Sequence, residues 1–182
     1  MDFVKLCMDA GASKAEEISI NKIIFQPELR VLCEQNACGR FARNYTCPPL
    51  VGEVDELIAK LTSFSKAVIW QNIYELEDSF DFEGMMDAQV RHNTMTLEVA
   101  RQARAALDNV LVLAAGGCHL CETCAIQTNE PCRHREDALS SLEAYGINVS
   151  KIGEATDMKY INGVNTVTYF SGLFYGRKGD FA

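Results

Sequence analysis

The sequence predicts an α/β fold, in which a mixed, partly parallel sheet carries flanking helices and two cysteine-rich loops. Two apolar runs, residues 67–74 and 110–115, are typical of buried strands. Residues 85–108 lie between them, contain neither glycine nor proline, and repeat apolar residues at steps of three and four, which predicts the longest helix. A strand, a long helix and a second strand in this order indicate a parallel βαβ unit.

The elements before this unit are shorter. Residues 1–17 predict an amphipathic helix, in which Cys7 is expected to pack as a small buried hydrophobe. Residues 18–25 are rich in isoleucine and predict a strand. Apolar residues at helical spacing predict a further helix over residues 53–64.

The elements after the unit complete the predicted fold. Residues 135–145 predict a helix that Gly146 ends, because glycine is the usual residue just past a helix terminus. A further short helix is expected up to Tyr160, and residues 166–170 and 173–175 predict a final strand or two. Within the unit itself, Trp70 is expected in the core and His92 on the exposed face of the long helix.

The bulk composition fits one soluble domain spanning residues 1–182, since the chain is long enough for one substantial core. A formal net charge of −8 argues against a general nucleic-acid binder, which needs a basic surface. No apolar run approaches membrane-spanning length, and the first residues do not resemble a signal peptide. We therefore expect a cytoplasmic protein with no membrane partner, whose clustered cysteines are metal ligands or catalysts rather than disulfides.

The most informative stretch is GGCHLCETCAIQTNEPCRH, residues 116–134. It contains a C-x2-C-x2-C-x7-C pattern, whose four members are Cys118, Cys121, Cys124 and Cys132. Iron–sulfur clusters are held by cysteine thiolates, and the bacterial ferredoxin run opens with the same spacing. Zinc is the alternative, although its usual pattern is two separated C-x2-C pairs or a pair with histidines. The stretch thus predicts a 4Fe–4S cluster site, with zinc left open.

A second cysteine group lies earlier in the chain. Cys33, Cys38 and Cys47 give a C-x4-C-x8-C pattern in a turn-rich loop, and two prolines follow the last cysteine. Three cysteines in such a loop indicate metal ligation, by a second cluster or by a second metal site whose fourth ligand is not evident.

Charged and aromatic neighbours of the two groups have two interpretations each. Arg30, Arg40 and Arg43 either stabilise the negative charge of a thiolate-ligated cluster or form a solvated face. His119 and His134 flank the longer loop and are interpreted as hydrogen-bond donors near a cluster, or as rare cluster ligands. No phosphate-binding glycine motif and no H-E-x-x-H is present, so no catalytic residue is assigned.

The later loop begins where the strand 110–115 is expected to end, which is where open α/β sheets commonly bind ligands. The double glycine before Cys118 lets the backbone approach a bound group closely. We expect both cysteine loops at one edge of the sheet, but the sequence does not determine whether they meet.

These segments resemble a family of predicted metal-binding proteins of unknown function that is common in anaerobic bacteria and archaea. The family's early C…C…CPP segment is matched up to Cys47-Pro48-Pro49, and its late GGC-x-L-C-x-x-C-A…PCR segment by residues 116–133. A third segment, S-x-E-A-x-G-I-x-V, is matched by residues 141–149. Metal binding is the function that the resemblance implies.

Three functions remain open at this point. The first is a cytoplasmic 4Fe–4S protein, with one or two clusters, that passes electrons to or from a larger redox protein. The second is a cluster-dependent enzyme, in which an iron left open at the three-cysteine loop binds a small substrate as a Lewis acid. The third is a zinc-stabilised scaffold or binding module. A homo-oligomer is a further option that the sequence leaves open.

Overall fold

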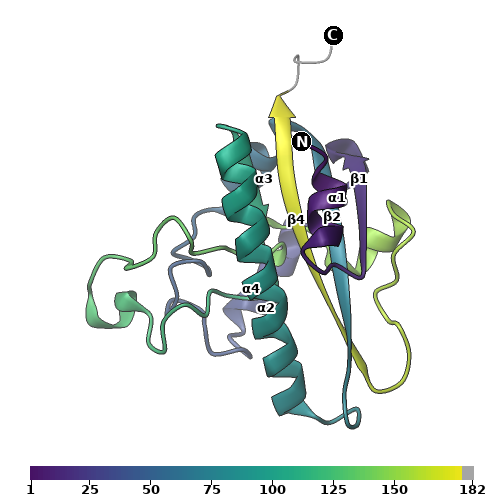
Figure 1. The fold of residues 1–182 in the computed structure, drawn as a ribbon. Helices are drawn as coiled ribbons and strands as arrows, with labels where there is room; N and C mark the ends of the chain where they lie inside the picture. The colour runs from purple at the N-terminus through teal and green to yellow at the C-terminus, as the bar shows by residue number, and fades with distance from the viewer. Residues whose placement is uncertain (178–182) are drawn as a thin grey trace.

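The computed structural model describes residues 1–177, which form a four-stranded sheet with helices on both faces (Figure 1). Its strands follow the order β1-β2-β4-β3, namely Lys14–Ser19, Phe64–Glu75, Thr166–Arg177 and Val110–Leu113. Every neighbouring pair of these strands is antiparallel. The predicted α/β class is confirmed, whereas the predicted partly parallel sheet is wrong. Residues 178–182 of the predicted single domain lie outside the described residues.

The error concerns which strands are neighbours. The long helix α4, Phe82–Ala106, joins β2 to β3 as predicted. These two strands do run in the same direction, because each is antiparallel to β4. However, β4 lies between them and hydrogen-bonds to both, so the expected parallel pair does not form.

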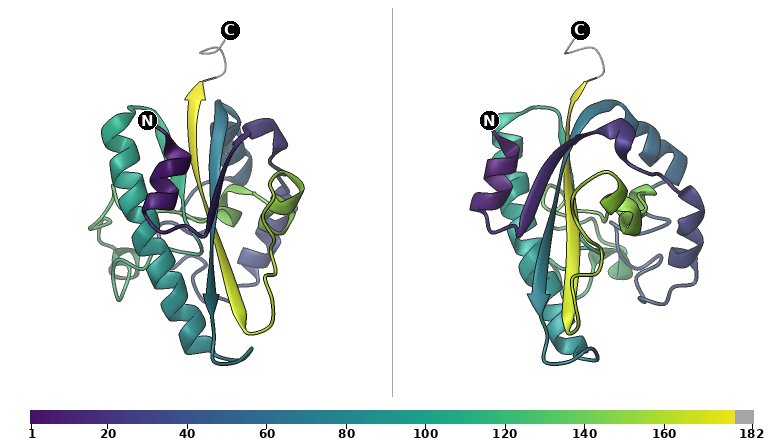
Figure 2. Two further views of the ribbon diagram at one scale, coloured as in Figure 1. Left: turned by 45° about the vertical axis from the view of Figure 1, so that its right-hand side comes forward. Right: turned by 90° about the vertical axis from the view of Figure 1, so that its right-hand side faces the viewer.

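Helices cover the two faces of the sheet (Figure 2). α1, Phe3–Asp9, and α4 lie on one face, and α3, Val54–Thr62, lies on the other together with α2, Arg30–Glu34. The predicted helices over 53–64 and 85–108 are thus confirmed, with α4 starting earlier because Asp81 caps it by accepting from the Gly84 N–H.

Each face of the sheet has its own hydrophobic core, because successive side chains of a strand point to opposite faces. On β2, Val68 and Trp70 pack with α1 and α4, whereas Ala67 and Ile69 pack with α3. Cys7 belongs to the core under α1 and is fully buried. The predictions for Cys7 and Trp70 are therefore confirmed.

Four predicted elements differ in the structure. The helix expected over residues 1–17 ends at Asp9, and its last four residues belong to the strand β1. The strand expected over residues 18–25 ends at Ser19 and continues as a 3₁₀ turn. The helix expected over 135–145 is mostly turns, because the backbone around Ser141 pairs with Ala114 instead of with its own preceding turn. The helix expected to run to Tyr160 is only a 3₁₀ segment, Val149–Glu154.

His92 was predicted on the exposed face of α4 and is fully buried instead. Its Nδ1 lies 2.9 Å from the Asn72 side-chain oxygen on β2, and its Nε2 lies 2.7 Å from the Ser171 hydroxyl on β4. Both partners come from strands distant in sequence, so the helical pattern alone could not reveal them.

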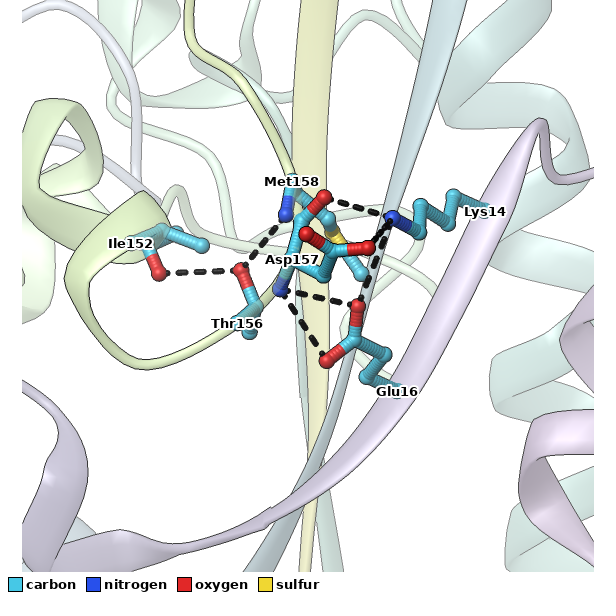
Figure 3. Close-up of polar contacts among 6 residues, drawn as sticks. All are labelled: Lys14, Glu16, Ile152, Thr156, Asp157 and Met158. Atoms are coloured by element: carbon cyan, nitrogen blue, oxygen red, sulfur yellow. Dashed lines mark hydrogen bonds and ion pairs between the residues drawn. The ribbon is translucent and has the colours of Figure 1, made fainter.

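Polar contacts attach the segment after the 3₁₀ helix Val149–Glu154 to the edge strand β1 (Figure 3). The Lys14 ammonium lies 2.9 Å from an Asp157 carboxylate oxygen, and the Asp157 backbone N–H donates to the Glu16 carboxylate at 3.0 Å. These bonds hold the β1 edge of the sheet. The later cysteine loop follows β3, which forms the opposite edge. No helix among residues 1–177 has both the length and the apolar character that crossing a membrane requires.

Candidate metal centre

The later cysteine loop leaves the sheet directly after β3. Gly116 adopts the left-handed conformation with φ +68°, and a side chain there would lie 2.6 Å from the Gln89 amide on α4. The chain then turns through a 3₁₀ helix, Ala125–Thr128, which begins just after Cys124 and ends at a left-handed Asn129. These turns bring all four predicted ligands to the lining of one small cavity, namely Cys118, Cys121, Cys124 and Cys132.

The other three thiols of this loop act electrostatically on Cys118. Burial raises the pKa of Cys118, and the charges of Cys132, Cys121 and Cys124 raise it further. Repulsion of this kind disfavours several thiolates around one cavity, and a bound cation relieves it. The arrangement therefore suits a group of positive metal ions that takes thiolate ligands.

The earlier cysteine loop shows the same character. Cys33 lies in α2, and Cys38 and Cys47 lie in the turns that follow. Burial raises the pKa of Cys47 to about 11, and the charges of Cys38 and Cys33 add to this effect, while Arg40 opposes it. The three thiols are thus close enough to interact, as the sequence predicted for a shared site.

The two loops meet at the backbone of Cys118, which answers the question that the sequence left open. The Asn44 side-chain amide donates to the Cys118 carbonyl at 3.0 Å, and the Cys118 N–H donates to the Thr46 hydroxyl at 3.0 Å. The Thr46 hydroxyl in turn donates to the Asn44 side-chain oxygen at 3.0 Å. Asn44 and Thr46 are both buried, and the earlier loop thus holds both backbone polar groups of Cys118, its N–H and its carbonyl.

Further bonds join the loops along their length. The Arg40 guanidinium donates to the Cys118 carbonyl at 3.1 Å, Arg43 donates to the Gln127 side chain at 2.8 Å, and the Tyr45 hydroxyl donates to the Glu130 carbonyl at 2.9 Å. The loops project side by side from the same part of the sheet (Figure 1). They therefore form one structural unit although more than 70 residues separate Arg40 from Cys118.

Gly117 is the point of closest approach between the loops. A Cβ at this position would lie 2.9 Å from the Cys47 sulfur and 3.0 Å from Arg40 Cδ. The backbone here leaves no room for a side chain, and the close approach is to side chains of the earlier loop. A polar pocket of about 290 Å³ next to this contact is lined by Cys38 of the earlier loop and by Cys118, Cys121 and Cys124 of the later one.

The predicted arginines take different positions. Arg30 donates to the backbone carbonyls of Ala144 and Gly52, and its charge lowers the pKa of Cys33 against the larger, opposite effect of burial. Arg40 has the corresponding effect on Cys47, again against a larger effect of burial. The sequence analysis missed Arg133, whose pKa is raised first by its bond to Glu130 and then by a hydrogen bond to Cys121.

The predicted histidines lie beside the thiols. His119 Nδ1 lies 3.0 Å from the Arg40 guanidinium, and burial followed by the charge of Arg40 lowers its pKa. His134 lines the cavity of the four cysteines. Both positions are compatible with the predicted role of hydrogen-bond donors near a bound group.

Asn44 and Thr46, which the sequence analysis also missed, fasten the loops together. The sequence marks them only by position, because Asn44 lies three residues and Thr46 one residue before Cys47. Charged and aromatic residues lie around them in the same loop. Such short polar side chains commonly bond to nearby backbone, and nothing in the sequence identifies a backbone partner 70 or more residues away.

The donor set fits a thiolate-ligated metal group in type and number. Four cysteines around one cavity match the ligands of a 4Fe–4S cluster or of a zinc ion, and the other three match such a set with one ligand missing. In residues 1–177 no three cysteine, histidine, aspartate or glutamate side chains lie close enough together to hold a metal ion. The four thiols of the later loop thus line one cavity without the close spacing that a single bound ion requires.

Comparison with known proteins agrees with this assignment. No curated protein and no solved structure matches the chain. One family model, described as "Predicted metal-binding protein (DUF2284)", matches residues 16–175. The match spans both cysteine loops and their seven cysteines, and it leaves out the buried Cys7. The chain belongs to this family of predicted metal-binding proteins.

Proposed function

We propose that the protein is an iron–sulfur protein that transfers electrons to or from a larger protein partner in a reducing compartment such as the cytoplasm. Its 4Fe–4S cluster would be held by Cys118, Cys121, Cys124 and Cys132. The earlier loop would hold a second cluster or complete a second metal site through Cys33, Cys38 and Cys47. The observation that carries the proposal is the attachment of the earlier loop to both backbone polar groups of Cys118 in the later loop.

This attachment supports the proposal because it joins the two cysteine loops through bonds to one residue. The three-residue spacing of Cys118, Cys121 and Cys124 is that of cluster-binding loops, and it favours iron–sulfur over zinc. A cluster supplies a one-electron redox centre when it is bound. The protein contributes positive charge nearby from Arg40 and Arg133, which stabilises a reduced, more negative cluster.

The test is an analysis of iron, acid-labile sulfide and zinc, with a visible spectrum, on protein made and kept anaerobically. We expect about four irons and four sulfides for one cluster, or about eight of each for two. Cys124→Ser should lose about four irons, whereas the matched control Cys7→Ala should retain all of them, since Cys7 lies in the hydrophobic core. Zinc at one or two equivalents without sulfide would reject the redox function and leave a zinc-stabilised module.

A cluster-dependent enzyme is the second candidate, and one observation favours it. The earlier loop offers three cysteines, and Cys38 lines the polar pocket of about 290 Å³ together with Arg40 and Arg43. A metal ion with an unfilled ligand position there would act as a Lewis acid, and the two guanidinium groups would orient a small anion. A spectrum that changes on adding small anions to the iron-loaded protein would support this candidate, and no change across a broad panel would reject it.

A further inference from the structure

We propose that a pocket between α4 and the later cysteine loop binds a small, uncharged organic molecule, about one ring in size, with a single hydrogen-bond acceptor. The pocket shares Cys118 with the polar pocket that faces the earlier loop, but its other walls come from α4, the end of β3, the later loop and the segment after the cysteines. The inference goes beyond the proposed redox function and does not depend on which metal the cysteines hold.

The walls of the pocket are mainly apolar. Val90 and Leu97 come from α4, Ala114 from the end of β3, Leu120 from the cysteine loop and Leu139 from the following segment. Val90 and Leu120 stand at the solvent side with exposed fractions of 47% and 40%. Apolar side chains from four segments around one cavity are typical of a site that takes an apolar ligand.

The size of the pocket sets the size of the ligand. Its volume is about 200 Å³. An engineered apolar cavity of about 150 Å³ in another protein binds benzene. A single ring with one short substituent therefore fits, whereas a nucleotide or a peptide does not.

Most of the polar side chains at the pocket already have partners within the protein. The Asn93 side chain bonds to both polar groups of the Ala115 backbone, at 2.8 and 3.1 Å. The Thr94 hydroxyl donates to the Val90 carbonyl at 2.8 Å, and Asp137 pairs with Arg101 at 2.6 Å. A charged or highly polar ligand would have to break these bonds, which favours an uncharged one.

His119 supplies the hydrogen bond that orients the ligand. The Arg40 guanidinium nitrogen lies 3.0 Å from His119 Nδ1 and 3.5 Å from His119 Nε2, so this contact does not select one tautomer. The imidazole ring carries at least one N–H donor in either tautomer. Because His119 lines the pocket, an oxygen acceptor on the ligand, such as a ketone carbonyl, would accept from it.

The test is ligand-observed fluorine NMR on the full chain, prepared anaerobically, with three probes of one size: para-fluoroacetophenone, para-fluorotoluene and para-fluorobenzoate. We expect saturable binding of the ketone, and binding of the toluene weaker by about 3- to 10-fold because it lacks the acceptor. Benzoate should bind least. No saturable binding of the ketone, or preferred binding of benzoate, would overturn the proposal.

Two variants locate the binding. Val90→Trp should fill the pocket and reduce ketone binding at least 10-fold, whereas Val164→Trp, at a valine 85% exposed and not part of this pocket, should leave it unchanged. His119→Phe keeps a ring but removes the donor, so ketone and toluene should bind equally. Equal ketone binding by Val90→Trp and the unaltered protein would overturn the proposal. Iron and sulfide contents, measured on the same samples, test the redox function separately.

Discussion

At the scale of single residues, His92 is the clearest case of a polar side chain that holds elements together. The Asn72 amide donates to the Gly11 carbonyl at 2.7 Å, which orients its oxygen toward His92 Nδ1. His92 Nε2 must then accept from the Ser171 hydroxyl, which also lies 3.1 Å from the Thr96 hydroxyl. The neutral imidazole thus connects α4 to β2 and β4 inside the protein.

This burial predicts a pH dependence of stability. Burial lowers the pKa of His92 from 6.5 to about 4, so the unfolded chain takes up a proton at a higher pH than the folded one. The contribution of His92 is complete above pH 6.5 and is lost as pH falls toward 4, by roughly 3 kcal/mol in all. Urea unfolding between pH 7 and 4 should show this loss, and His92→Gln should show a shallower decline. Equal slopes for the two proteins would contradict the prediction.

Thr46 predicts a second effect at this scale, on the attachment of the loops. Thr46→Val keeps the shape of the side chain but leaves the Cys118 N–H without its acceptor and removes one donor from Asn44. The cost should be about 1–3 kcal/mol, because an unpaired buried group loses its full solvation. Thr46→Ser retains the hydroxyl and serves as the control. The measurement is the rate at which a chelator removes metal. This rate should rise for Thr46→Val and stay unchanged for Thr46→Ser.

At the scale of elements, the close approach of the loops at Gly117 predicts a coupling between them. Gly117→Ala places a methyl group 2.9 Å from the Cys47 sulfur, so one loop must shift. The destabilisation should be smaller in a Cys47→Ala background, where the sulfur is absent. Unfolding free energies of the four proteins should give a coupling of about 0.5–3 kcal/mol, as for residues in direct contact. Additive effects would show that the loops adapt independently.

Helices α3 and α4 and strands β2 and β3 could be predicted because their signals are local. The buried runs that became β2 and β3, and the apolar stripe of α4, follow from periodicity within each segment. The position of β4 between β2 and β3 is not local information, so the expected parallel pair was wrong. The segment 135–145 has helical spacing, but its backbone finds a better partner in Ala114, which no local pattern reveals.

The candidate site divides in the same way. The seven loop cysteines could be predicted as two groups from their spacing, and the four of the later group line one cavity in the structure. The contacts that join the groups come from Asn44, Thr46 and Arg40, whose partners lie 70 or more residues away. Residue type indicated the chemistry of each loop, whereas the contact between the two loops depends on the tertiary fold.

At the scale of the whole molecule, the two cysteine loops are separate from the hydrophobic cores that stabilise the fold. The two hydrophobic cores lie on the faces of the sheet, and Cys7 is the cysteine that they contain among the described residues. The loops are joined to one another mainly by polar bonds. Loss of metal should therefore loosen the loops without unfolding the sheet.

Metal removal tests this separation. After treatment with a chelator, the far-ultraviolet circular dichroism should keep most of its signal, because α4 and the sheet do not depend on the cysteines. Trypsin should then cut faster within the loops, at Arg40, Arg43, Arg133 and Arg135. A cooperative loss of all secondary structure on chelation, as in zinc fingers, would contradict the prediction.

The central place of β4 also determines when the site can form during biosynthesis. β3, which carries the later cysteine loop, pairs within the described sheet with β4 alone. The ribosome delivers Cys132 before it reaches Arg177, and at typical elongation rates the interval is roughly 2 to 9 seconds. During that interval the cysteines lack the strand that positions them. We therefore expect metal insertion to follow the synthesis of β4, and a nascent chain stalled before β4 to present its thiols to oxidants.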